Sequence, residues 1–173
     1  MIISRKPPYS STESDPEKTQ MQINKLLRDY GVEGVQWTTR YDTNEVRLAF
    51  IVETEINGVK KKVGIEVTPP VFLAIRRTWD PKQGKYMKVN APNWAQSFRL
   101  LYWWLKAKLE AVSYGLSTVE KEFLAQVMVQ LPSGQKTTVG EALTNSIAKG
   151  TLMLGAEPEK SKVIDIEEEK EEE

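Results

Sequence analysis

The stretch Asn93–Tyr114, NWAQSFRLLYWWLKAKLEAVSY, is the longest uninterrupted helical pattern in the chain. At about 100° per residue its large apolar side chains fall on one stripe: Trp94, Phe98, Leu101, Leu105, Leu109, Val112 and, just beyond the stretch, Leu116. The stripe predicts a helix that buries one face, with Trp104 flanking it. Trp103 projects from the opposite face between Arg99 and Lys106, so we expect a second layer of protein or a partner to cover it.

The residues before this helix predict a β-hairpin. Apolar and polar residues alternate over 45–56 and 59–67, on either side of Asn57-Gly58, the preferred dipeptide for a two-residue turn. The turn sets the register, which places apolar pairs on one face and opposite charges on the other. The expected cross-strand pairs are Phe50 with Ile65, Val52 with Val63, Glu53 with Lys62 and Glu55 with Lys60.

A third strand at 35–41 extends this hairpin into an antiparallel meander. The strand joins the hairpin through 42–45, and we take Tyr41 to face Val46 across this loop. This register places Trp37 opposite Phe50 and adds it to the apolar face.

The remaining segments predict a second hairpin and three more helices. The hairpin joins 71–79 to 85–89, with a short helix over 70–77 as the alternative. Asp15-Pro16 begins the first helix, and capping boxes at Ser117–Glu120 and Thr138–Glu141 begin the others. The expected helices are 16–30, 118–129 and 138–149, with a turn and a short strand pair over 131–138.

We therefore expect an α+β fold, in which an antiparallel meander of three to five strands packs on the long central helix. Additional C-terminal helices form a second layer. Residues 1–14 are expected to be a flexible N-terminal arm, 15–155 a single domain and 156–173 a disordered acidic tail. This layout is similar to that of single-strand annealing proteins and to many other α+β domains, and no motif in the chain singles out a family.

The composition argues against an enzyme. The 173 residues include no cysteine and no histidine, which removes thiolate sites, histidine bases and zinc hydrolase sites. Phosphate-binding glycine loops and dinucleotide fingerprints are also absent. Thr68 stands where a metal-dependent nuclease would carry a lysine two positions after Glu66. We expect a non-enzymatic protein with no metal and no cofactor.

The hydropathy pattern indicates neither a membrane span nor a signal peptide. No apolar run approaches the ~20 residues that cross a bilayer, and the start, MIISRKPPYSS, lacks an apolar core. We expect a cytoplasmic protein with no membrane partner.

The charge of the chain is divided between its two parts. Residues 1–110 carry 18 basic and 12 acidic side chains, whereas 111–173 carry 6 and 12. The basic residues concentrate over 58–88, where aromatic residues lie between them. This pattern is typical of a surface for single-stranded DNA or RNA, because cations neutralise phosphates and flat rings stack on unpaired bases. The candidate residues are Lys60, Lys62, Arg76, Arg77, Trp79, Lys82, Lys85, Tyr86 and Lys88.

Each candidate surface also has a structural interpretation. The basic residues can form a solvated face on which Trp79 and Tyr86 hold the hairpin as a cross-strand pair. Arg99, Trp103 and Lys106 can bind a partner or a second copy of the chain, or Trp103 can lie under the C-terminal helices. The acidic tail either competes for the basic surface or serves solubility. The second functional hypothesis is therefore a structural or accessory protein that self-associates or docks a partner through the central helix and the tail.

Overall fold

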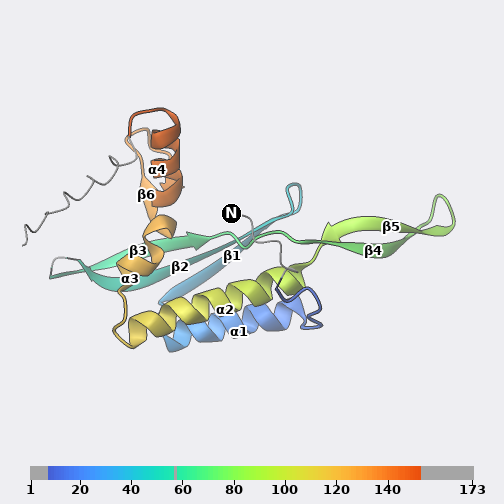
Figure 1. Ribbon diagram of the computed structural model, residues 1–173, viewed down its shortest axis with the longest axis horizontal. Coiled ribbons are helices and arrows are strands. Elements are labelled where there is room, and N and C mark those ends of the chain that lie inside the picture. Colours follow the sequence, from blue (N-terminus) through green and yellow to red (C-terminus); the bar gives the residue numbers. More distant parts are fainter. Residues whose placement is uncertain (1–7, 57, 153–173) are drawn as a thin grey trace, which may run out of the picture.

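The computed structural model describes residues 8–56 and 58–152 and has an α+β fold with antiparallel sheets and four α-helices (Figure 1). In chain order its elements are α1 (Pro16–Asp29), β1 (Gly34–Arg40), β2 (Glu45–Ile56), β3 (Val59–Val67), β4 (Leu73–Asp80), β5 (Lys85–Pro92), α2 (Trp94–Ser113), α3 (Val119–Phe123), the 3₁₀ turn η1 (Leu124–Gln126), β6 (Met128–Gln130), β7 (Lys136–Thr138) and α4 (Val139–Ala148). No helix among the described residues is both long and apolar enough to cross a membrane.

The strands form three separate sheets. β1, β2 and β3 make the meander, β4 pairs only with β5, and β6 pairs with β7. The second hairpin is confirmed over the alternative helix, but it does not extend the meander. Thr68-Pro69-Pro70 follows β3 directly, and proline has no amide hydrogen to donate to a ladder. The chain therefore leaves the first sheet before β4 begins.

The register of β2 and β3 is confirmed at each expected pair, including Phe50 with Ile65 and Glu53 with Lys62. The expected register of β1 is wrong by two residues, since Trp37 faces Leu48 instead of Phe50. The loop ends one residue earlier than expected, because Asn44 takes a left-handed conformation with φ of 51° and Glu45 then pairs with Arg40. A shift of two residues leaves every side chain on its face, so Trp37 still joins the apolar side.

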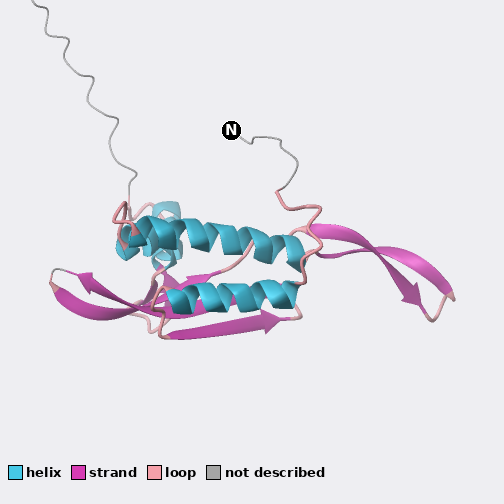
Figure 2. Cartoon of the chain, turned by 90° about the horizontal axis from the view of Figure 1, so that it is seen from below, coloured by secondary structure: helices cyan, strands magenta, loops and turns pink. Residues whose placement is uncertain are grey.

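Two helices share the apolar face of the meander. α1 and α2 lie side by side and run roughly along the strands (Figure 2), and Trp37 donates a hydrogen bond of 2.9 Å to Asn24 of α1. The core cluster combines both helices with the sheet: Ile23, Leu27, Val32, Leu48, Phe50, Val52, Ile65, Val67, Leu101, Leu105, Leu109 and Phe123. The expected stripe on α2 is buried from Phe98 to Leu109, but Leu116 lies beyond the helix and is exposed.

The helix expected over 118–129 is much shorter. Thr118 caps α3 by accepting a hydrogen bond from the amide of Lys121, so the expected capping box at Ser117–Glu120 does not form. After η1 the chain becomes extended, and Val127 bridges to Ile65 of β3. A β-branched residue at the edge of a sheet gains more from this pairing than from another helical turn.

The end of the described chain forms a C-terminal unit, which we define as β6, β7 and α4. The capping box that begins α4 at Thr138 is confirmed. Gly140 permits close packing on η1, since a Cβ at this position would lie 2.9 Å from the carbonyl oxygen of Ala125. The unit projects from the side of the meander opposite α1 and α2 (Figure 1). The expected second layer over the central helix is therefore wrong.

α3 covers Trp104 of α2 instead. Phe123 makes edge-to-face contacts with Phe50 and Trp104, with ring centroids 5.9 and 5.8 Å apart. Lys108 lies over the Trp104 ring and forms an ion pair of 2.9 Å with Glu122. We refer to α1, α2, α3 and β1–β3 together as the body.

β4 and β5 project from the body as a two-stranded arm, residues 73–92 (Figures 1 and 2). Every residue from Ile75 to Trp79 and from Lys85 to Asn90 is exposed. Neither face of the arm therefore packs on any other described part of the chain. Two-stranded ribbons are marginally stable in water when nothing packs on them.

Candidate nucleic-acid interface

The base of the arm is joined to the start of α2. The amide of Asn93 donates a hydrogen bond of 2.7 Å to the carbonyl oxygen of Phe72. Asn93 is also the N-cap of α2, and its side chain accepts from the amide of Gln96. Gln96 is buried and donates a bond of 2.8 Å to the carbonyl oxygen of Pro8. The arm therefore extends from a tightly hydrogen-bonded corner of the body.

The tip of the arm is a closed turn over 80–84. The carboxylate of Asp80 accepts hydrogen bonds from the amides of Lys82 and Gln83, at 2.8 and 3.3 Å. The amide of Gly84 donates to the carbonyl oxygen of Asp80 at 2.8 Å, and Gly84 takes a φ of 59°, which favours glycine. The one acidic side chain of the arm is thus occupied by backbone amides.

The register of β4 and β5 sorts the side chains of the arm onto two faces. Directly opposed residues of an antiparallel pair lie on the same face. The face that we call the aromatic face carries four successive cross-strand pairs: Trp79 with Tyr86, Arg77 with Lys88, Ile75 with Asn90, and Leu73 with Pro92. The opposite face carries Asp80 with Lys85, Thr78 with Met87, Arg76 with Val89, and Ala74 with Ala91.

The two rings of the aromatic face contact each other and remain open to solvent. The centroids of Trp79 and Tyr86 are 5.2 Å apart, with ring planes at 67°. The predicted cross-strand aromatic pair is therefore confirmed. Trp79 is nevertheless 51% exposed and Tyr86 69% exposed, so the contact leaves a large part of each ring for another flat group.

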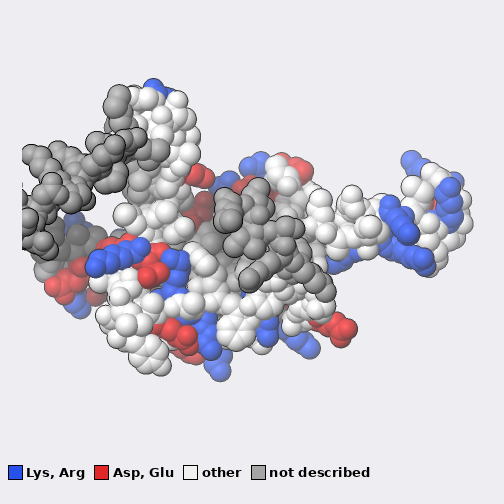
Figure 3. Space-filling model, viewed as in Figure 1, with Lys and Arg blue, Asp and Glu red and all other residues white. Residues whose placement is uncertain are grey.

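The cations of the arm lie along its whole outer part. Arg77 and Lys88 are directly opposed, next to the aromatic pair, while Arg76 and Lys85 lie on the other face and Lys82 in the tip. None of these five side chains forms an ion pair within the described ranges. Figure 3 shows the resulting concentration of basic side chains at the far end of the arm.

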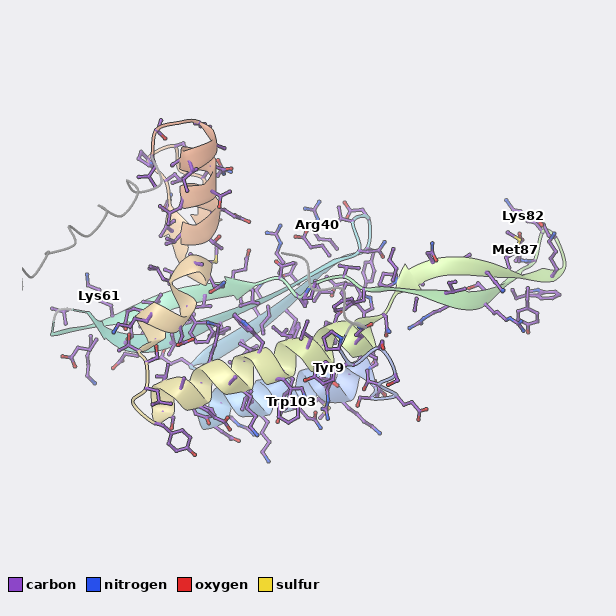
Figure 4. The ribbon with its side chains drawn as sticks, in the orientation of Figure 1. Tyr9, Arg40, Lys61, Lys82, Met87 and Trp103 are labelled. Carbon is purple, nitrogen blue, oxygen red and sulfur yellow. The ribbon has the colours of Figure 1, made fainter. Side chains whose placement is uncertain are left out.

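Lys60 and Lys62 do not belong to this surface. They lie in β3 next to the β2–β3 turn, and Figure 4 places the neighbouring Lys61 at the opposite end of the molecule from Lys82. Lys60 forms an ion pair of 3.0 Å with Glu53, and Lys62 one of 2.6 Å with Glu33. The hydrogen bond and the charge of Glu33 raise the pKa of Lys62 above its ordinary value. The contiguous basic segment of the sequence is therefore two separate groups in space.

Trp103 forms a second candidate surface on α2. Its side chain is 41% exposed, and Arg99 and Lys106 lie 5.8 and 5.2 Å from the ring centroid. Arg99 also bonds to Gln22 of α1, and Lys106 pairs with Glu110. The C-terminal helices do not cover this ring, so the interpretation that placed Trp103 under these helices is wrong. Trp103 lies on the body, whereas Lys82 and Met87 lie at the end of the arm (Figure 4), so the two surfaces are distinct.

A cleft of about 430 Å³ separates the body from the C-terminal unit. Its wall includes Trp104 and the proline pair at 69–70, with Glu66 and Glu141 among its polar groups. Both carboxylates already have partners, because Glu66 pairs with Arg47 and the Glu141 carboxylate accepts hydrogen bonds from the Thr137 hydroxyl and the Thr138 amide. Within residues 8–56 and 58–152, no cluster of three or more acidic side chains has the spacing of a metal site. The cleft is therefore a weaker candidate than the arm.

Sequence reasoning missed the exposed apolar residues of the arm. Leu73, Ile75, Met87 and Val89 are all exposed, and the alternation of Leu73, Ile75, Arg77 and Trp79 was the signal that placed apolar and basic residues on one face. No known protein-family model matches the chain, and no curated protein or solved structure is significantly similar to it.

Proposed function

We propose that the protein binds single-stranded DNA or RNA, without an enzymatic activity, through the aromatic face of the arm. The observation that carries the proposal is the adjacency of two exposed pairs on this face, Trp79 with Tyr86 and Arg77 with Lys88. The rings offer surfaces on which unpaired bases stack, and the cations next to them neutralise phosphates. Arg76, Lys82 and Lys85 add positive charge around the same part of the arm.

The separation of the arm from the body supports this assignment. A ribbon whose large apolar side chains face water on both sides gains stability when a ligand covers them. Ile75 is 71% exposed and lies two positions from Arg77 on the aromatic face. Bases that continue along the face beyond the cations can therefore pack against Ile75 and Leu73. The absence of cysteine also fits the reducing cytoplasm, where we place the protein.

Fluorescence anisotropy tests the proposal with the full chain and a labelled single-stranded oligonucleotide of about 20 nucleotides, longer than the ~4–16 that one binding site covers. We expect saturable binding at ~50 mM salt. Contacts by five cations to a single strand give a salt slope of about −3.5, so affinity falls about 100-fold by ~200 mM. A lack of binding at ~50 mM salt contradicts the proposal.

The exposure of Trp103 supports a second candidate function, a structural or accessory protein that self-associates through α2. Arg99 and Lys106 hold the ring on the outer side of the helix, and tryptophan and arginine are enriched at the centres of protein interfaces. Multi-angle light scattering separates this candidate from the first one. The second candidate function predicts an oligomer that dissociates in the variant Trp103→Ala. A protein that is monomeric at all concentrations contradicts this candidate.

A further inference from the structure

The arm carries a dense group of cations that form no ion pair among the described residues. Six cations of the body form ion pairs, namely Arg40, Arg47, Lys60, Lys62, Lys106 and Lys108, whereas Lys18, Lys25, Arg28, Lys61 and Arg99 form none within the described ranges and are spread over α1, β3 and α2. The arm carries five cations against Asp80, whose carboxylate accepts hydrogen bonds from the amides of the tip. Arg77 and Lys88 are also directly opposed, an arrangement that like-charge repulsion disfavours unless an anion lies between them.

The end of the chain carries a concentration of negative charge that could neutralise the cations of the arm. Residues 157–173 contain nine acidic and three basic side chains, a net charge of −6, and six of the acidic residues lie in the last seven positions. These positions lie outside the described residues, which end at Leu152. The 21 residues of 153–173 can span at most about 75 Å. The glutamates are therefore at the end of the segment that reaches furthest.

The length of 153–173 matters because the C-terminal unit, after which this segment begins, lies away from the arm. Figure 1 places α4 at one end of the molecule and the arm at the other. A segment that leaves α4 must cross the molecule before it can contact the arm, and 157–166, which carries fewer charges, is the part that would cross. We propose that the acidic segment 157–173 docks on the arm of its own chain, with its glutamates on Arg77, Lys88 and the neighbouring cations.

Docking of this segment gives the arm a competitor for any polyanion. The docking proposal rests on the proposed function in one respect only: it assumes that a nucleic acid is the ligand that displaces the segment. Glutamates satisfy the cations but offer no flat surface to Trp79 and Tyr86. A single strand satisfies both, so it displaces the segment, whereas anions without bases compete poorly. The segment therefore makes the arm selective for ligands that stack.

Zero-length crosslinking with a carbodiimide tests the contact in the full chain without nucleic acid. It joins a lysine amine to a carboxylate that it touches, and mass spectrometry identifies the linked peptides. We expect crosslinks from Lys82, Lys85 or Lys88 to 167–173 in the monomer band at ~50 mM salt, and their loss at ~500 mM salt, where charges are screened beyond about 4 Å. Crosslinks to lysines of the body instead, or only between two copies of the chain, overturn the proposal.

A matched variant separates this proposal from the proposed function. The full-length variant with Gln at 167–169 and 171–173 keeps the length of the segment and removes its charge. We expect it to lose the crosslinks and to bind the oligonucleotide at least fivefold more tightly at ~50 mM salt. Crosslinks in the wild type without oligonucleotide binding support the docking and reject the nucleic-acid function. Binding without crosslinks, and unchanged in the variant, rejects the docking alone.

Discussion

Arg77 and Lys88 are directly opposed on the arm, on the face that also carries the Trp79–Tyr86 pair. Like charges in this position weaken a two-stranded ribbon, and the described residues provide no acidic partner for either one. The arrangement lowers the stability of the free arm, and we propose that an anion between the two cations offsets this repulsion. In the proposed function, the aromatic pair next to these cations favours anions that also carry flat groups.

The first prediction concerns these two cations. Substituting both by glutamine, in the variant Arg77→Gln/Lys88→Gln, removes two phosphate contacts. We expect the slope of log Kobs against log salt to decrease in magnitude by about 1.4, since each contact to a single strand contributes about 0.7. Anisotropy titrations over a salt series measure the slope. The matched control Lys60→Gln/Lys62→Gln removes two ion-paired lysines of the body, and an equal loss in this control refutes the assignment to the arm.

The second prediction concerns the rings. Trp79→Ala should weaken oligonucleotide binding by about 5- to 150-fold, because stacking contributes about 1–3 kcal/mol per base. The salt slope should stay unchanged, since no charge is lost. Trp79→Phe keeps a flat ring and should retain most of the affinity, which also controls for loss of the cross-strand pair. If the alanine and phenylalanine variants bind equally well, the ring does not stack on a base.

The third prediction concerns the attachment of α3 to the core. Phe123 is 1% exposed and contacts both Phe50 and Trp104. Phe123→Ala should lower the free energy of unfolding by about 3–5 kcal/mol, because it leaves a cavity between these rings. Urea denaturation followed by circular dichroism measures the change. Phe123→Leu keeps an apolar side chain of intermediate size and should cost less than Phe123→Ala, because it leaves a smaller cavity. A loss below about 1 kcal/mol in the alanine variant contradicts the packing.

The fourth prediction is an acid dependence of stability. The hydrogen bond from the Thr54 hydroxyl holds the pKa of Glu120 below its ordinary value, and the hydrogen bond from Lys108 lowers the pKa of Glu122. A lowered folded-state pKa stabilises the protein above the unfolded-state pKa, near 4.3 for glutamate, and this contribution is lost as pH falls through the folded-state value. We therefore expect Tm to fall as the pH drops below about 4.3.

Thr54→Val tests the origin of this dependence. Removing the hydroxyl returns the pKa of Glu120 toward its ordinary value, so the fall in Tm between pH 5 and 3 should become shallower. Thermal melts at several pH values provide the measurement. Thr39→Val is the matched control, because Thr39 is exposed on β1. A pH profile of Thr54→Val that overlays the wild type contradicts the role of the hydrogen bond.

Local sequence signals predicted the elements whose partners are close in the chain. Asn57-Gly58 determined the β2–β3 register, and Thr138 with Glu141 determined the start of α4, because each signal acts over a few residues. The loop before β2 had no comparable signal for the register, because its sequence does not determine that Asn44 adopts a positive φ. The resulting error of two residues did not change which side chains face the core.

Contacts between distant residues explain what the sequence did not predict. Val127 leaves a helical pattern to bridge Ile65, and no local property of 118–129 indicates that partner. The basic residues of 58–88 were predicted to form one surface because they are close to one another in the sequence. In the fold, Lys60 and Lys62 pair with carboxylates of the body, and the residues from Arg76 onward form the arm. The opposition of Arg77 and Lys88 required the register of β4 and β5.

Hydrogen exchange with mass spectrometry tests the central claim most directly, because it locates the ligand on the unaltered chain. The exposed strands of the arm should exchange rapidly in the free protein, since local opening of a two-stranded ribbon costs little. On saturation with a single-stranded oligonucleotide at ~50 mM salt, we predict that peptides covering 73–92 become protected, while those covering β1–β3 and α2 do not change. Unchanged exchange in the arm, or protection confined to the body, contradicts the proposal that the arm binds nucleic acid.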